Sequence, residues 1–306
     1  MFSRAEAFER NRGLISLAEQ EKLATTLVAI AGCGGVGGSH AHAFARMGIG
    51  RFRIADSDTF SVANINRQIG ATIQSIDRNK ADVTAEMIRS INPEAAVEVC
   101  PGNITPASVG GFVNGADLVV DGVDFFALLG PRQLFRAAWH AGIPALTSAP
   151  LGFSATLHVF ARGGMSFDEY FDLRDDQDPF DQLVRFFVGL APSGLHLPYM
   201  DLGSVDVHTG RGPSSILACQ MAASLTGGEA IKILLRRSSP LLAPEYLQVD
   251  CYRQLLRKRH LRGGNRNWYQ RIKRSIVTRK LRKLGLDQAL KKSALNTAAS
   301  SAPLEK

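Results

Sequence analysis

Residues 27–38 read LVAIAGCGGVGG and carry the pattern that decides the fold. Residues 27–31 are an unbroken apolar run, which is typical of a buried parallel strand. The glycines that follow allow a tight turn, and residues 39–47, rich in alanine with Phe44 and Met47, indicate a helix. A strand, a glycine turn and a helix in this order predict a nucleotide site, because backbone N–H groups at a helix start bind phosphates.

Strand and helix patterns alternate along much of the chain. Further strands are expected at residues 52–55, 96–100, 117–121, 145–147, 157–160 and 246–251, and helices at residues 80–91, 132–141 and 214–235. This alternation predicts an α/β fold with a doubly wound, mostly parallel Rossmann-like sheet and helices on both faces. Residues 163–212 have few regular signals and are expected to form a long crossover loop with short helices.

The charge is distributed unevenly between the body and the C-terminal part. Residues 1–250 contain 20 Lys and Arg against 26 Asp and Glu, whereas residues 251–306 contain 16 against 2. We therefore expect one globular domain over residues 1–252 and a basic, partly helical tail over residues 253–306.

The tail has the periodicity of an amphipathic basic helix, with thirteen Lys and Arg and no acid over residues 251–283. Its apolar positions are Trp268, Ile272, Ile276, Leu281 and Leu284. Three interpretations stay open. The stripe packs on the body or on a partner subunit, the helix binds nucleic acid phosphates, or it lies on an anionic membrane surface.

Acidic residues are concentrated at residues 168–181, where seven of fourteen positions are Asp or Glu. They interleave with Phe167, Tyr170, Phe171 and Phe180. One interpretation is a short amphipathic helix whose acidic side is solvated. The other is a docking face for a basic carrier protein or substrate.

No apolar run approaches the roughly 18 residues of a membrane span, and the N-terminus lacks the apolar core of a signal peptide. We therefore expect a cytoplasmic protein without a transmembrane segment. The four cysteines are Cys33, Cys100, Cys219 and Cys251. They form no CxxC pair, so no zinc site is expected.

Charged residues follow the predicted strands at one edge of the sheet. Asp56 lies 24 residues after Gly32, where a carboxylate can accept hydrogen bonds from ribose hydroxyls. Arg67 and Lys80 then supply two cations, which suit a triphosphate better than a nicotinamide ring. Asp124 follows a further strand, where a carboxylate is suited to hold Mg²⁺. The glycine turn alone would favour an NAD-dependent oxidoreductase, so that alternative stays open.

The order of these motifs resembles the ThiF/HesA/MoeB family of ubiquitin-activating-enzyme-like adenylyltransferases, and most closely its HesA-like branch. The resemblance runs from about residue 8 to residue 235. Its pieces are Phe8-Glu9-Arg10-Asn11, Gly32 to Gly37, Asp56-x-Asp58, Asn64-x-x-Arg67-Gln68, Lys80-Ala81, Asp121-Gly122-Val123-Asp124, and the late helix with Glu229-Ala230-Ile231-Lys232.

The resemblance implies a role for each matching position within an adenylation domain over residues 1–252. The phosphate loop would consist of Gly32, Gly34, Gly35 and Gly37. Asp56, with Asp58 beside it, would bind the ribose of ATP, and Arg67 and Lys80 would bind its triphosphate. Asp124 would bind Mg²⁺. Asn64 and Gln68 would help to hold the phosphates and the incoming carboxylate. Arg10 would reach the triphosphate of a neighbouring subunit, because the family is typically homodimeric.

The same resemblance implies adenylation of a carboxylate with release of pyrophosphate. The expected substrate is the C-terminus of a small ubiquitin-like or sulfur-carrier protein or of a peptide. A tRNA-modifying dehydratase of the same family is an alternative, as is a scaffold without catalysis. Phe125 replaces the usual Asn after Asp124, and residues 163–212 contain no Cys, so no covalent thioester on this chain is expected.

Overall fold

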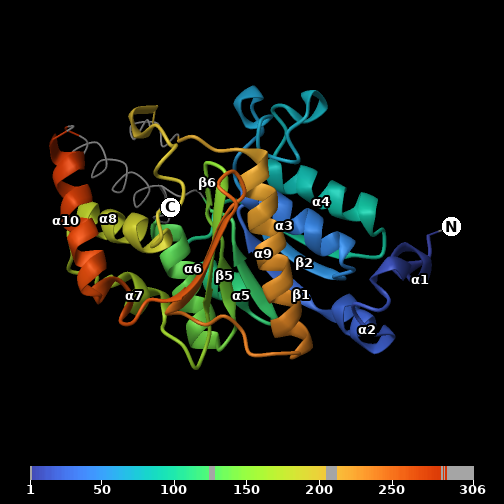
Figure 1. The fold of residues 1–306 in the computed structure, drawn as a ribbon. Coiled ribbons are helices and arrows are strands. Elements are labelled where there is room, and N and C mark those ends of the chain that lie inside the picture. The colour runs from blue at the N-terminus through green and yellow to red at the C-terminus, as the bar shows by residue number, and fades with distance from the viewer. Residues whose placement is uncertain (1, 124–127, 205–211, 284, 286, 288–306) are drawn as a thin grey trace.

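The computed structural model describes residues 2–123, 128–204, 212–283, 285 and 287 (Figure 1). The strands are β1 (Leu27–Ala31), β2 (Arg51–Ala55), β3 (Ala96–Cys100), β4 (Leu118–Asp121), β5 (Ala145–Thr147), β6 (Pro150–Leu151), β7 (Ser154–Phe160), β8 (Glu245–Asp250) and β9 (Leu255–His260). The α-helices are α1 (Arg4–Ala7), α2 (Leu17–Thr25), α3 (Gly35–Arg46), α4 (Lys80–Ile91), α5 (Val109–Val113), α6 (Leu129–Ala141), α7 (Phe167–Phe171), α8 (Pro179–Leu190), α9 (Ile216–Leu235) and α10 (Trp268–Lys283). The 3₁₀ helices are η1 (Glu9–Asn11), η2 (Val62–Asn64), η3 (Ile73–Ser75), η4 (Leu202–Ser204) and η5 (Gly264–Arg266).

The strands form one sheet in the order β3-β2-β1-β4-β5-β7-β8-β9, with β6 paired to β7. The first five strands in this order are parallel, and the pairs beyond β5 are antiparallel. The predicted doubly wound, Rossmann-like α/β fold is confirmed. The carboxyl ends of the parallel strands meet at one edge of the sheet, which is where such folds bind ligands.

The central strand β1 is buried on both faces, as its apolar run predicts. Val28 and Ile30 belong to a core shared with α3, α4 and α9, whereas Ala29 and Ala31 belong to a second core shared with α5 and α6. Helices therefore cover both faces of the sheet (Figure 1).

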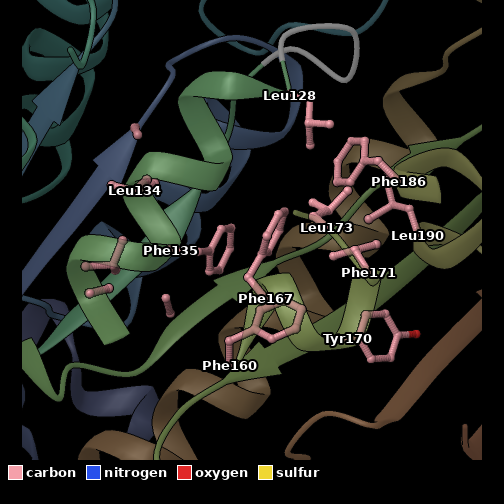
Figure 2. Close-up of a cluster of buried hydrophobic side chains, with 14 of the residues drawn as sticks. Leu128, Leu134, Phe135, Phe160, Phe167, Tyr170, Phe171, Leu173, Phe186 and Leu190 are labelled. Atoms are coloured by element: carbon pink, nitrogen blue, oxygen red, sulfur yellow. The ribbon is translucent and has the colours of Figure 1, made fainter. Parts of the chain in front are cut away.

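The crossover region contains more regular structure than the sequence analysis predicts. Besides the short α7, it holds the twelve-residue α8, which Asp178 caps through the amide of Phe180 and which begins at Pro179. The aromatic residues of this region fill the second core. Figure 2 shows Phe167, Tyr170 and Phe171 gathered beside Phe135 and Phe160. The ring centres of Phe135 and Phe167 are 4.6 Å apart.

The acidic residues of this region bind arginines of the same chain. The ion pairs are Asp168 with Arg132 and Arg136, Asp175 with Arg132 and Arg136, Asp172 with Arg185 and Arg274, and Asp181 with Arg185. The aromatic side of α7 is buried, as the interpretation of an amphipathic helix predicts, and the acidic residues Glu169, Asp175, Asp176 and Asp178 are exposed. The interpretation of a docking face stays a prediction.

The sheet continues past residue 253, where the composition changes. Strand β9 pairs with β8 along its whole length, from Asp250 opposite Leu255 to Glu245 opposite His260. After it, α10 packs on α8. The basic residues do not interrupt the sheet because β9 is its edge strand, where charged side chains remain in water.

The predicted basic helix is present as α10. Most of its predicted apolar stripe does not pack on the body. Trp268, Ile272 and Ile276 are exposed, whereas Val277 and Leu281 pack against the core. Leu284 lies outside the described residues. Among the described residues, no helix is both long and apolar enough to cross a bilayer.

Candidate functional site

The glycine turn between β1 and α3 is too crowded for side chains. A β-carbon on Gly37 would lie 1.9 Å from the carbonyl oxygen of Gly32. Gly32 itself has a φ of +88°, and a β-carbon there would lie 2.4 Å from the carbonyl oxygen of Gly122 after β4. Helix α3 therefore starts directly beside the ends of β1 and β4. The N-cap residue of α3 is Gly34, and no side chain of the described residues caps the helix, so its first N–H groups can bind an anion.

Asp56 lies at the end of β2 and is oriented by the glycine turn. Its Oδ2 accepts a hydrogen bond from the Cys33 amide at 2.7 Å, and its Oδ1 accepts one from the Asp58 amide at 2.9 Å. Burial raises the pKa of Asp56, while these two donors and the nearby Lys80 act in the opposite direction. The carboxylate is thus fixed beside the helix start, in the position predicted for a ribose ligand.

Lys80 begins α4 and pairs with Asp58 in the loop that follows β2. Its ammonium lies 2.8 Å from Oδ2 of Asp58, and its amide donates to the Asp58 carbonyl at 2.9 Å. The Lys80 side chain is 9% exposed, whereas that of Asp58 is 68% exposed. Asn79 caps α4 and also donates to the Asp56 carbonyl at 3.1 Å. The ammonium of Lys80 is therefore buried at the start of α4, whereas its partner Asp58 is exposed to water.

Arg67 and Gln68 also lie close to the glycine turn. A β-carbon on Gly35 would lie 3.8 Å from Cγ of Arg67, and one on Gly34 would lie 3.5 Å from Nε2 of Gln68. Gln68 is buried, and its Oε1 has no hydrogen-bond partner among the described residues. One guanidinium nitrogen of Arg67 donates to the carbonyl of Ala63 and to Oδ1 of Asn66, both at 2.9 Å. The N–H groups on its other two nitrogens remain for a ligand.

Asn64 has a local structural role in this structure. Its Oδ1 accepts a hydrogen bond from the Ser61 amide at 3.0 Å and so closes the turn of η2. Two residues later, Asn66 donates to the Ser214 carbonyl at 3.1 Å, which joins this loop to the start of α9. Asn66 was not among the predicted site residues, because no local pattern indicates a contact across 148 positions.

Arg10 does not approach the glycine turn of its own chain. Its neighbour Asn11 bonds Gln20, which in turn donates to the Met47 carbonyl at 3.0 Å. Met47 follows the C-terminus of α3, and the twelve residues of that helix span roughly 18 Å. The structure therefore groups Asp56, Asp58, Lys80, Arg67 and Gln68 around the start of α3, and places exposed Arg10 at its other end.

The predicted Mg²⁺ ligand, Asp124, lies outside the described residues. Asp121, three positions before it, is buried, which raises the pKa of its carboxyl to about 6. It accepts hydrogen bonds from the Val123 amide at 3.0 Å and from the Thr147 hydroxyl at 2.9 Å. Asp121 thus anchors the segment that leads toward Asp124. Among the described residues, no three His, Cys, Asp or Glu side chains are grouped as a metal site.

Two cysteines lie beside the glycine turn, and both are buried. Cys219 on α9 would be 3.0 Å from a β-carbon on Gly35, and burial raises its pKa to about 11. Burial also raises the pKa of Cys33. Cys219 is a core residue, and the high pKa makes its thiol a poor nucleophile.

Comparison with known proteins links this geometry to one family. The sequence profile described as "ThiF family" matches residues 8–268 of this chain. Over 98 residues the chain is 42% identical to the tRNA threonylcarbamoyladenosine dehydratase of Escherichia coli, which covers 32% of this chain and 37% of that protein. Over 146 residues it is 34% identical to the sulfur carrier protein ThiS adenylyltransferase of Escherichia coli, which covers 47% of this chain and 57% of that protein. The matches therefore cover less than two thirds of the length of either relative.

Solved structures share the fold at low sequence identity. The Escherichia coli MccB structure with AMPCPP and MccA superposes with a TM-score of 0.64 and 19% identity, over 85% of this chain and 73% of that one. The PaaA structure superposes with a TM-score of 0.63 and 18% identity, over 85% of this chain and 76% of that one.

Proposed function

This chain belongs to the ThiF family, and on that premise we propose that it uses ATP to activate a carboxylate as an acyl-adenylate. A carboxylate oxygen of the substrate attacks the α-phosphorus of ATP, the bond from that phosphorus to the bridging oxygen breaks, and pyrophosphate leaves. A carboxylate is already ionised near pH 7, so the reaction needs positioning and charge neutralisation more than a base.

The observation that carries this proposal is the buried ammonium of Lys80, held beside the start of α3 and the fixed carboxylate of Asp56. Asp56 would hold the ribose, and the uncapped amides of α3 would hold phosphate oxygens. Lys80 can exchange its exposed partner Asp58 for a phosphate, since both are anions. Arg67, which lies close to Gly35, would bind phosphate oxygens as well.

Mg²⁺ and a second subunit complete the proposed site. When bound, Mg²⁺ would neutralise charge on the phosphates. The residue proposed to hold it is Asp124, because the preceding Gly122 contacts the glycine turn. Arg10 is exposed and lies far from its own glycine turn. We therefore propose that it reaches the triphosphate bound by a partner subunit in a homodimer, and that the enzyme works in the cytoplasm.

The proposed substrate is the C-terminal carboxylate of a small sulfur-carrier-like protein or a peptide. The name of one relative specifies the carrier protein ThiS as what it adenylylates. A tRNA nucleoside carboxylate is the second candidate, because the local identity to the tRNA threonylcarbamoyladenosine dehydratase reaches 42%.

Pyrophosphate exchange into ATP separates these candidates. Purified protein is mixed with ATP, labelled pyrophosphate and either a Gly-Gly-ending carrier protein, the same protein with its C-terminus amidated, or tRNA. Exchange with the free carrier C-terminus and none with the amidated form supports the proposed substrate. Exchange with tRNA alone selects the second candidate, and ATP binding without exchange for any carboxylate contradicts adenylation.

A further inference from the structure

Helix α10 has an inner face that is fixed to the body by polar contacts. Gln270 is buried and donates to the Val188 carbonyl at 3.1 Å. Arg274 lies 3.5 Å from Asp172, and Lys273 donates to the Pro192 carbonyl. Together with Val277 and Leu281 in the core, these contacts fix which side of the helix faces outward.

The outer face of α10 exposes large apolar side chains. Trp268 is 70% exposed, Ile272 49% and Ile276 58%, and the spacing of four residues places them along one side of the helix. Tyr269 beside them is 52% exposed. Such a row is unusual on the surface of a monomeric soluble protein and indicates a surface that is covered by a partner.

Cations surround this row. The exposed residues Arg271, Arg279, Lys280 and Lys283 lie on the same helix, and none has an ion-pair partner among the described residues. Because residues 251–283 contain no acid, the partner that complements this face must be anionic.

The position of α10 leaves its outer face accessible to an extended surface. In Figure 1 the helix stands at one edge of the molecule, on the far side from α1, with α8 on its inner side. A flat partner can therefore meet the whole length of the helix without contact with the nucleotide site.

We propose that the outer face of α10 binds an anionic lipid membrane as an interfacial helix. Apolar side chains would enter the region between headgroups and acyl chains, and the cations would meet lipid phosphates. Nucleic acid explains the cations and the two aromatic rings, but it offers no apolar environment for Ile272 and Ile276. A membrane surface accounts for both properties, and this assignment does not depend on the proposed reaction.

Sedimentation with vesicles tests the proposal on the full chain. Vesicles of phosphatidylcholine alone are compared with vesicles that contain phosphatidylglycerol. We expect the protein to pellet with the anionic vesicles only, and less at high salt. The variant Trp268→Asp/Ile272→Asp/Ile276→Asp should bind at least about tenfold more weakly. Leu14→Asp, at an apolar position 69% exposed and distant in sequence, should bind like the wild type.

Tryptophan fluorescence reports whether α10 itself enters the lipid. The chain has two tryptophans, Trp139 and Trp268, so Trp139→Phe leaves Trp268 as the reporter. Its emission should shift to the blue with anionic vesicles, and brominated lipid should quench it. Absence of pelleting, unchanged Trp268 emission, or binding of the same face to tRNA but not to vesicles would each overturn the proposal.

Discussion

Two regions of the molecule are rich in charged side chains but differ in how these are paired. One is the candidate site around the start of α3, called the nucleotide end below, and the other is the corner formed by α6, α7, α8 and α10. At the corner, acidic side chains are matched by arginines of the same chain, with an aromatic core behind them. At the nucleotide end, Lys80 has an exposed partner, and Oε1 of Gln68 has no hydrogen-bond partner among the described residues.

This difference separates structural charge from charge that is available to a ligand. At the corner, the buried Arg185 and Arg132 each have a partner that is itself shielded, Asp172 at 19% and Asp168 at 21% side-chain exposure, and such pairs separate only at a large cost in desolvation. A buried cation with a solvated partner can exchange it for a phosphate at little cost. We therefore expect substitutions at the corner to lower stability and substitutions at the nucleotide end to lower activity.

The glycine turn should show the largest effect, because it has no space for a side chain. Gly37→Val would force atoms into the 1.9 Å approach to the Gly32 carbonyl and should lower the free energy of unfolding by about 3 kcal/mol or more, with loss of ATP binding. Urea titration measures the first effect. The control is Gly110→Ala in α5, where an added β-carbon meets nothing within 4 Å. Equal stability of the two variants would show that the turn is not crowded.

Removal of the Lys80 cation should affect the reaction much more than the fold. For Lys80→Met we expect pyrophosphate exchange to fall about 100- to 1,000-fold, because a donor directed at transition-state charge has that order of effect. Unfolding should change by less than about 1 kcal/mol, because Asp58 remains solvated. The matched control is Lys22→Met on the exposed side of α2. Exchange at the wild-type rate in Lys80→Met would remove the main support for the proposed site.

At the corner, a substitution should lower stability much more than activity. Arg185 is 8% exposed and pairs with Asp172 and Asp181, so Arg185→Ala should lower the free energy of unfolding by about 3–5 kcal/mol. Arg174→Ala breaks only the exposed pair with Asp176 and should cost less than about 0.5 kcal/mol. Exchange activity per folded molecule should stay unchanged in both. A loss of activity without a loss of stability in Arg185→Ala would contradict the comparison.

Asp121 offers a smaller test that depends on pH. Its carboxyl keeps its proton to about pH 6 in the folded protein but releases it near the ordinary value of 3.8 when unfolded. The protonated carboxyl therefore stabilises the folded protein fully below pH 3.8, and this stabilisation is lost as the pH rises through 6. The resulting decrease in the free energy of unfolding is roughly 3 kcal/mol at most. Asp121→Asn should become more stable relative to the wild type over that range. A constant difference between pH 4 and pH 7 would show that the pKa of Asp121 is not raised.

The sequence predicts the parallel part of the sheet well because it is locally encoded. An apolar run such as residues 27–31, followed directly by glycines, is typical of a central strand that is buried on both faces. The expected bounds of β3, β5 and α4 agree with the structure residue for residue. The antiparallel extension through β9 is not apparent, because an edge strand rich in arginine and lysine has no apolar alternation.

The orientation of α10 on the body could not be predicted from the periodicity of its sequence. The spacing of Trp268, Ile272 and Ile276 predicts a helix with an apolar side, but not where that side points. Polar contacts of Gln270 and Arg274 with distant parts of the chain determine the inner face. Such contacts depend on tertiary structure, so they could not be predicted from local sequence.

In the candidate site, too, some features could be predicted from the sequence and others could not. The proximity of Asp56, Arg67 and Lys80 could be predicted, because all three belong to connections at the carboxyl edge of a parallel sheet. The capping role of Asn64 and the bond from Asn66 to Ser214 could not, since they depend on the detailed path of the loop.

Calorimetric titration with ATP, AMP and NADH tests the central claim most directly, namely that the pocket beside the glycine turn binds a triphosphate. We expect ATP to bind much more tightly than AMP, because Lys80 and Arg67 would contact the β- and γ-phosphates. This advantage should disappear in Lys80→Met, and NADH should not bind detectably. Equal affinity for ATP and AMP, or tight binding of NADH, would contradict the claim.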